Sequence, residues 1–154
     1  MYEKKFKHIK TTLQIFINLI DGKYVNFKVC EYYGDMSFIE LSKIVFTVVT
    51  MQDAEELKQY ERLYRKALEV FYCFTKSYSN SVFEHFDIGL SISVLDMATF
   101  ALQNDSVDVL QCATGTIANL FTFAFETVTK AESGKESVLS ERVKSFMTEG
   151  SEAC

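Results

Sequence analysis

The sequence predicts an all-α fold, and three observations carry this prediction. The chain of 154 residues contains no proline and six glycines, so long helices meet few obligatory breaks. Hydrophobic residues make up 48% of the chain and recur at three- and four-residue steps, the spacing of one helix face. The longest apolar runs also follow residue types that cap helices. Because the length suits a single domain with one sizeable core, we expect about six main helices.

The N-terminal half contains three predicted helices, over residues 6–21, 38–49 and 53–74. The first ends at Asp21-Gly22, since glycine commonly terminates a helix. An aromatic-rich connector from Gly22 to Asp35 separates it from the second, which begins with Asp35 or Ser37 as cap and a capping box at Ser37–Glu40. Asp53 opens the third helix with another capping box and an acidic first turn, which the helix dipole favours.

The predicted elements of the C-terminal half are a polar cluster, Ser77–Ser81, a short turn over 82–86, helices over 88–102 and about 105–128, a polar loop over 130–136 and an amphipathic helix over 137–147. The polar cluster is expected to close the helix before it. Asn104-Asp105-Ser106 suits a helix N-cap. The apolar tract Val107–Val128 is interrupted by polar residues such as Asp108 and Glu126, so it predicts a buried helix and no membrane insertion.

A helix pair repeats along the chain. The segments Gly34–Thr50 and Phe86–Leu102 are both capped apolar helices followed by a longer helix, which is typical of HEAT/ARM-like helical repeats in an alpha-alpha superhelix. The predicted divisions are 1–22, the second helix of a preceding repeat; 23–77 and 78–130, two helical repeats; and 131–154, a polar loop and the first helix of a following repeat. Without an evident polar cap, we expect a fragment of a longer solenoid that leaves apolar surface open and self-associates when isolated.

Residue types for catalysis do not converge in the sequence. His8 and His85 have no Ser or Cys partner at a recognised catalytic spacing, so both are interpreted as surface or loop histidines. Ala113–Thr116 lacks the Gly-Lys-Ser/Thr ending of a phosphate-binding loop, and Gly115 is interpreted as a small residue for close helix packing. We therefore predict no enzyme activity and no cofactor, although an enzyme with an unrecognised site remains a third hypothesis.

The four cysteines predict neither a metal site nor a disulfide framework. Cys30, Cys73, Cys112 and Cys154 lie about forty residues apart and form no CxxC or CxxH pair. They are interpreted as buried free thiols, which fits a reducing compartment. The N-terminal residues Met1–His8 lead directly into an amphipathic pattern, so no secretory signal is expected.

Charge is distributed unevenly. Residues 1–76 carry twelve Lys/Arg against ten Asp/Glu, whereas residues 77–129 carry none against six. The acidic stretch is either a solvated face with carboxylates at helix starts or a strip for a basic partner. The polar side of the predicted helix from Leu57 to Phe74 is basic. The candidate partner-binding residues are Lys58, Arg62, Arg65, Lys66 and Asp96.

Five segments carry a resemblance to a known family: Tyr2–Phe6, Lys23–Val29, Gly34-Asp35, Tyr64–Val70 and Thr114–Phe125. They resemble the C-terminal part of exportin-7-type nuclear export receptors, members of the importin-β (karyopherin) superfamily. The connector, reading Lys-Tyr-Val-Asn-Phe-Lys-Val before Tyr-Gly-Asp, is its most distinctive part. Lys28 stands where the family has glycine, and Thr50-Met51-Gln52 stands where the family tends to have a proline.

The resemblance implies protein cargo and GTP-bound Ran as partners of the full-length receptor, contact with nuclear pore proteins, and shuttling between nucleus and cytoplasm. The family's principal Ran-binding repeats lie in its N-terminal part, so no Ran contact is assigned here. The segment would act as scaffold or cargo-facing surface. The alternative is a helical-repeat interaction scaffold unrelated to nuclear transport. Direct nucleic-acid binding is not expected, because the isoelectric point is near 5.1.

Overall fold

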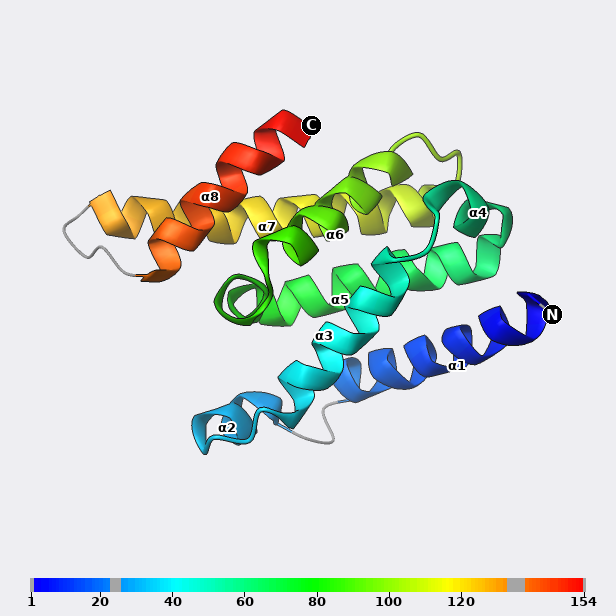
Figure 1. Cartoon of the computed structure of the whole chain (residues 1–154), viewed down its shortest axis with the longest axis horizontal. Coiled ribbons are helices and arrows are strands. Elements are labelled where there is room, and N and C mark those ends of the chain that lie inside the picture. The colour runs from blue at the N-terminus through cyan, green and yellow to red at the C-terminus, as the bar shows by residue number, and fades with distance from the viewer. Residues whose placement is uncertain (1, 23–25, 133–137, 154) are drawn as a thin grey trace.

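The computed structural model describes residues 2–22, 26–132 and 138–153, and these residues form eight α-helices (Figure 1). The helices are α1 Tyr2–Asp21, α2 Phe27–Tyr32, α3 Ser37–Thr50, α4 Ala54–Gln59, α5 Glu61–His85, α6 Ile88–Ala101, α7 Val107–Glu132 and α8 Val138–Ala153. The all-α prediction is confirmed. Six helices have 14 residues or more, and the two extra helices, α2 and α4, have six residues each.

The six longer helices lie in two layers (Figure 1). Helices α1, α5 and α7 lie side by side in one layer, and α3, α6 and α8 lie side by side in the other. The helices of one layer run in one direction and those of the other layer return, so successive long helices are antiparallel. This arrangement is consistent with the predicted helical-repeat fold, in which each pair packs on its neighbours. The repeat boundaries themselves stay a prediction.

The connector contains a helix that the sequence did not predict. Asn26 caps α2, and its side chain accepts a hydrogen bond from the backbone N–H of Val29. Gly34 ends the helix with a φ of +86°. Its N–H donates to the carbonyl of Glu31, and the N–H of Asp35 donates to that of Cys30, the pair of bonds that defines a Schellman motif. The Tyr-Gly-Asp sequence of the connector is therefore a helix stop.

Lys28 lies on α2, where a residue with a side chain favours the helix more than glycine does. Its ammonium lies 5.8 Å from the ring centre of Tyr78 on α5. Residues 23–25 of the distinctive stretch lie outside the described residues.

The capping box predicted at Ser37–Glu40 is wrong. Helix α3 begins at Ser37 with Met36 as its N-cap residue, and Met36 makes no side-chain cap bond. Asp35 instead accepts a hydrogen bond from the Ser37 N–H at 3.0 Å, and hydrogen bonding to Ser37 lowers the pKa of Asp35. Glu40 pairs with Lys43 rather than closing a box. The Asp53 cap is confirmed, because its carboxylate accepts from the N–H groups of the two following glutamates, Glu55 and Glu56.

The predicted helix over 53–74 and the break after it also need correction. The backbone leaves the helix at Tyr60, which separates α4 from α5. The polar cluster Ser77–Ser81 does not end α5, which continues to His85 with a kink at Tyr78 (φ −131°, ψ 31°). Val82 and Phe83 are buried, so packing against the core holds this segment helical where a turn was predicted.

The predicted polar loop over 130–136 also needs correction. Helix α7 extends to Glu132, which places the first three residues of the predicted loop, 130–132, in a helix. Residues 133–137 lie outside the described part of the chain. No helix in the described part is long and apolar enough to span a bilayer.

Apolar side chains remain exposed where α1 and α3 meet. Leu41, Ile44 and Val48 on α3 are 40%, 60% and 39% exposed, and they line an apolar groove of about 270 Å³ with α1. This surface fits the expectation that the segment leaves apolar area open.

Two buried side-chain hydroxyls in the described chain, those of Tyr64 and Ser81, have no hydrogen-bond partner, and Tyr64 is the larger residue. Tyr64 is 1% exposed, and its hydroxyl has no hydrogen-bond partner among the described residues. Replacing it with phenylalanine removes a buried donor that has lost its water without gaining a partner, so we expect the free energy of unfolding to rise by about 1 kcal/mol. Urea unfolding measures the change. Tyr32→Phe, at an 84% exposed position, is the matched control and should leave stability unchanged; a loss of stability in Tyr64→Phe would show that the hydroxyl is satisfied.

Candidate partner-binding groove

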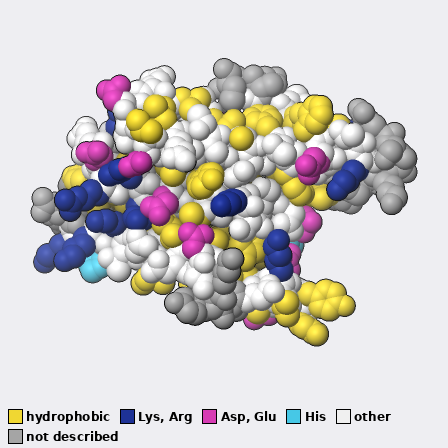
Figure 2. All heavy atoms as spheres, turned by 180° about the vertical axis from the view of Figure 1, so that it is seen from behind, with side chains coloured by type: hydrophobic (Ala, Val, Ile, Leu, Met, Phe, Trp, Pro, Cys, Tyr) yellow, Lys and Arg dark blue, Asp and Glu magenta, His cyan; other side chains and the backbone are white. Residues whose placement is uncertain are grey.

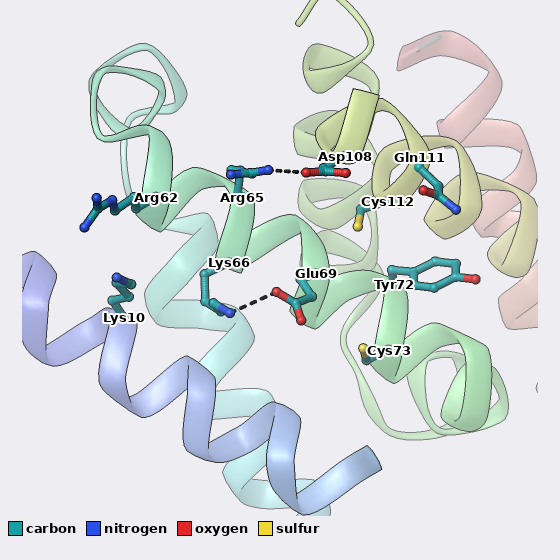
Figure 3. Close-up of a pocket in the computed structure, with 10 residues that line it drawn as sticks. All are labelled: Lys10, Arg62, Arg65, Lys66, Glu69, Tyr72, Cys73, Asp108, Gln111 and Cys112. Atoms are coloured by element: carbon teal, nitrogen blue, oxygen red, sulfur yellow. Dashed lines mark hydrogen bonds and ion pairs between the residues drawn. The ribbon is translucent and has the colours of Figure 1, made fainter. Parts of the chain in front are cut away.

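A groove lies between α1, α5 and α7, the three helices of one layer (Figure 3). Its volume is about 520 Å³. The lining residues are Lys10 from α1; Arg62, Arg65, Lys66, Glu69, Tyr72 and Cys73 from α5; and Asp108, Gln111 and Cys112 from α7. Residues that are far apart in the sequence thus form one surface because the three long helices lie side by side.

The groove is basic at the start of α5. Lys10 of α1 and Arg62 of α5 both line this end of the groove (Figure 3). Both also line an adjacent hollow of about 620 Å³, together with Lys7 of α1. Viewed from behind, Lys and Arg side chains gather at one end of this face (Figure 2). Within the described residues, neither Lys10 nor Arg62 takes part in an ion pair, so both charges are available to a ligand.

Two further cations in the groove are already paired. Arg65 forms an ion pair with Asp108, which joins α5 to α7. Lys66 donates hydrogen bonds to Gln14 of α1 at 2.5 Å and to Glu69 at 3.0 Å. These contacts hold the groove walls together and reduce the charge that Arg65 and Lys66 can offer to a partner.

The other end of the groove holds two thiols. Burial and the nearby Asp21 raise the pKa of Cys73 to about 12, and burial raises the pKa of Cys112. Both thiols therefore stay protonated at neutral pH, which argues against a nucleophilic role. Cys73 is buried as expected, whereas Cys112 and Cys30 are partly exposed, so the prediction that all were buried is wrong for those two; Cys154 lies outside the described residues.

Gly115 of α7 lets Tyr72 enter this end of the groove. A Cβ atom at position 115 would overlap the Tyr72 ring. The interpretation of Gly115 as a residue for close helix packing agrees with this contact. Tyr72 gives the thiol end of the groove an aromatic wall, and its ring centre lies 6.0 Å from the ammonium of Lys76.

The candidate residues from the sequence divide between several places. Arg62, Arg65 and Lys66 come together in the groove. Lys58 lies on α4, with its ammonium 5.6 Å from the Phe100 ring centre. Asp96 lies on α6 in the other layer, where it lines a separate hollow. Neither Lys58 nor Asp96 is among the residues that line the groove.

Sequence reasoning missed Lys10, Tyr72 and Gln111 as members of the groove. Lysines at Lys4, Lys7 and Lys10 recur at three-residue steps, and this spacing could have marked a basic face on the first helix. The acidic residues of the second half are dispersed: Asp108 pairs with Arg65 in the first turn of α7, whereas Asp96 lies in the other layer.

Comparisons with protein-family models, curated proteins and solved structures give no match. The fold and the groove together describe an all-α chain, consistent with the helical-repeat type, with a groove that is basic at one end between α1, α5 and α7.

Proposed function

We propose that the chain is a segment of an exportin-type nuclear transport receptor, and that the groove between α1, α5 and α7 receives an acidic stretch of its protein cargo. One observation carries the groove's part in this proposal: Lys10 and Arg62 line the same end of the groove without an ion-pair partner in the described chain. Cations that remain unpaired on a concave surface attract carboxylates, which can bind arginine in two parallel hydrogen bonds.

The transport role rests on the resemblance of the connector and the flanking helices. Under this proposal the complete receptor binds cargo with GTP-bound Ran, contacts nuclear pore proteins and shuttles between nucleus and cytoplasm. The segment contributes scaffold and cargo-facing surface. A protein partner is favoured over nucleic acid because the chain has a net charge of −5, whereas nucleic-acid-binding domains are usually basic as a whole.

Cargo recovery with and without GTP-loaded Ran tests the transport role. The complete receptor should retain cargo in the presence of GTP-loaded Ran and lose it in its absence, since the two ligands of an exportin stabilise each other's binding. Cargo recovery that is indifferent to Ran would favour the interaction scaffold unrelated to transport.

Charge reversal tests the groove. Lys10→Glu together with Arg62→Glu should reduce the affinity for a fluorescein-labelled Asp/Glu-rich peptide by about tenfold or more, because two attractions become repulsions. Fluorescence anisotropy at low and high salt measures the affinity, and the salt dependence should weaken along with it.

Lys144→Glu combined with Lys43→Glu is the matched control, since it makes the same change in net charge on α8 and α3, away from the groove. Equal losses of affinity in the two double variants would show that net charge, and not the groove, attracts the peptide.

A further inference from the structure

Three potential metal ligands meet where the connector helix α2 touches the end of α5. Glu31 lies on α2, and Glu84 and His85 are the last two residues of α5. The Nε2 atom of His85 lies 2.9 Å from a carboxylate oxygen of Glu31 and 3.6 Å from one of Glu84. One ligand atom from each residue lies within 4.8 Å of the other two. The cluster lies away from the groove lining and plays no part in the proposed cargo site.

A single proton on His85 cannot bridge both carboxylates. The Nε2 atom carries at most one hydrogen, so it can donate a full hydrogen bond to one carboxylate but not to both. The second carboxylate, at 3.6 Å, is beyond hydrogen-bond distance. A divalent cation would instead accept electron pairs from the imidazole and both carboxylates at once.

The distances suit a small transition-metal ion. Ligand atoms at about 2.05 Å from a tetrahedral zinc ion lie about 3.3 Å from each other. The two observed nitrogen–oxygen separations, 2.9 Å and 3.6 Å, lie on either side of that value. The side chains are partly sheltered from water, with exposed fractions of 21% for Glu31, 25% for His85 and 39% for Glu84.

The backbone around the three ligands is held on both sides. Asn26 caps the start of α2 and the Schellman bonds at Gly34 close its end, which fixes the helix that carries Glu31. Arg142 of α8 donates hydrogen bonds to the carbonyl oxygens of Glu84 at 2.8 Å and Phe86 at 2.5 Å. Ligands on fixed elements lose little freedom when an ion binds, which favours affinity.

We propose that Glu31, Glu84 and His85 form a binding site for a divalent transition-metal ion, with Zn²⁺ as the ion that this nitrogen and oxygen set suits best. Three protein ligands leave a fourth tetrahedral position for water or for a side chain of a partner. The bound ion ties the connector helix to the end of α5, so it stabilises the junction between the first helix and the remainder of the fold.

Titration of the reduced, metal-free chain with Zn²⁺ and with Co²⁺ tests the site. We expect one ion per chain, a visible d–d spectrum for Co²⁺, and a rise in Tm of about 5 °C or more at a hundredfold excess of Zn²⁺ over its Kd. Glu31→Gln and His85→Gln should each weaken binding tenfold or more. His8→Gln and Glu40→Gln, which make the same chemical changes outside the cluster, should leave it unchanged.

A further variant tests whether a cysteine, rather than the proposed ligands, binds the ion. Cys30→Ser should retain binding, and the Co²⁺ complex should show no thiolate charge-transfer band. Circular dichroism of each metal-free variant establishes that it is folded. Absence of stoichiometric binding to the folded chain, or loss of binding in Cys30→Ser with retention in both cluster variants, would overturn the proposal.

Discussion

Replacing Phe74 with alanine is expected to lower the free energy of unfolding by about 3–5 kcal/mol. Phe74 is fully buried on α5 at the centre of an aromatic cluster that joins both layers. Five ring centroids lie 5.0–6.2 Å from its own, those of Phe16, Phe38, Phe46, Tyr78 and Phe86. Truncation removes these contacts and leaves a cavity that several rigid rings can fill only in part.

The loss should appear as a fall in Tm of roughly 6–20 °C, or as an unfolded chain if the whole domain is marginally stable. Thermal and urea unfolding followed by circular dichroism measure it. Phe125→Ala is the matched control, because Phe125 is 68% exposed on α7 and its removal leaves no cavity. A loss below about 1 kcal/mol for Phe74→Ala would contradict a single aromatic core centred on this residue.

The helices that could be predicted from the sequence have ends set by local chemistry. Gly22 follows the last turn of α1, and Asp53 caps α4 through hydrogen bonds that span two or three residues. Such signals act within one helical turn, so a short stretch of sequence contains both the capping residue and the backbone groups that it caps. The helix α2 was missed because six residues rich in aromatics show no helical period, and its two caps, Asn26 and Gly34, are recognisable only as a pair.

The continuation of α5 could not be predicted for a different reason. The polar segment Ser77–Ser81 has the composition of a loop, but Tyr78, Val82 and Phe83 are buried against other helices. Phe83, for example, stacks on Phe123 of α7, 40 positions further along the chain. Tertiary packing thus overrides local preference, and only the positions of the other helices reveal it.

The candidate groove was predictable in part. Arg62, Arg65 and Lys66 share one face of one helix, which the helical period shows directly. Their meeting with Lys10 depends on α1 lying beside α5, and pairing of Arg65 with Asp108 depends on α7 lying on the other side. The cluster of Glu31 with His85 spans 54 positions and has no spacing rule of its own. Sequence reasoning therefore interpreted His85 as an ordinary histidine.

Alkaline pH is expected to destabilise the fold, because acidic groups whose pKa burial raises, Cys73 and Tyr64 above all, must stay protonated in it. Burial, with the nearby Asp21, raises the pKa of Cys73 to about 12, and burial, with the charge of Glu55, raises the pKa of Tyr64 to about 12. In the unfolded chain the thiol and the phenol ionise near their ordinary values of 9 and 10. The unfolded state therefore loses protons first, so stability is full below about pH 9 and falls as the pH rises towards 12.

Each group lowers the free energy of unfolding by at most about 1.4 kcal/mol per pH unit within its window, Cys73 from near pH 9 and Tyr64 from near pH 10. Urea midpoints at pH values between about 8 and 11, under reducing conditions, measure the decline. Cys73→Ala should flatten the first part of the curve and Tyr64→Phe the second, whereas Tyr32→Phe, on the exposed surface, should leave the curve unchanged. Tyr78 and Cys112, whose pKa values burial also raises, account for the decline that remains in these variants. A decline as steep in both core variants as in the original chain would show that Cys73 and Tyr64 ionise as freely in the folded chain as in the unfolded one.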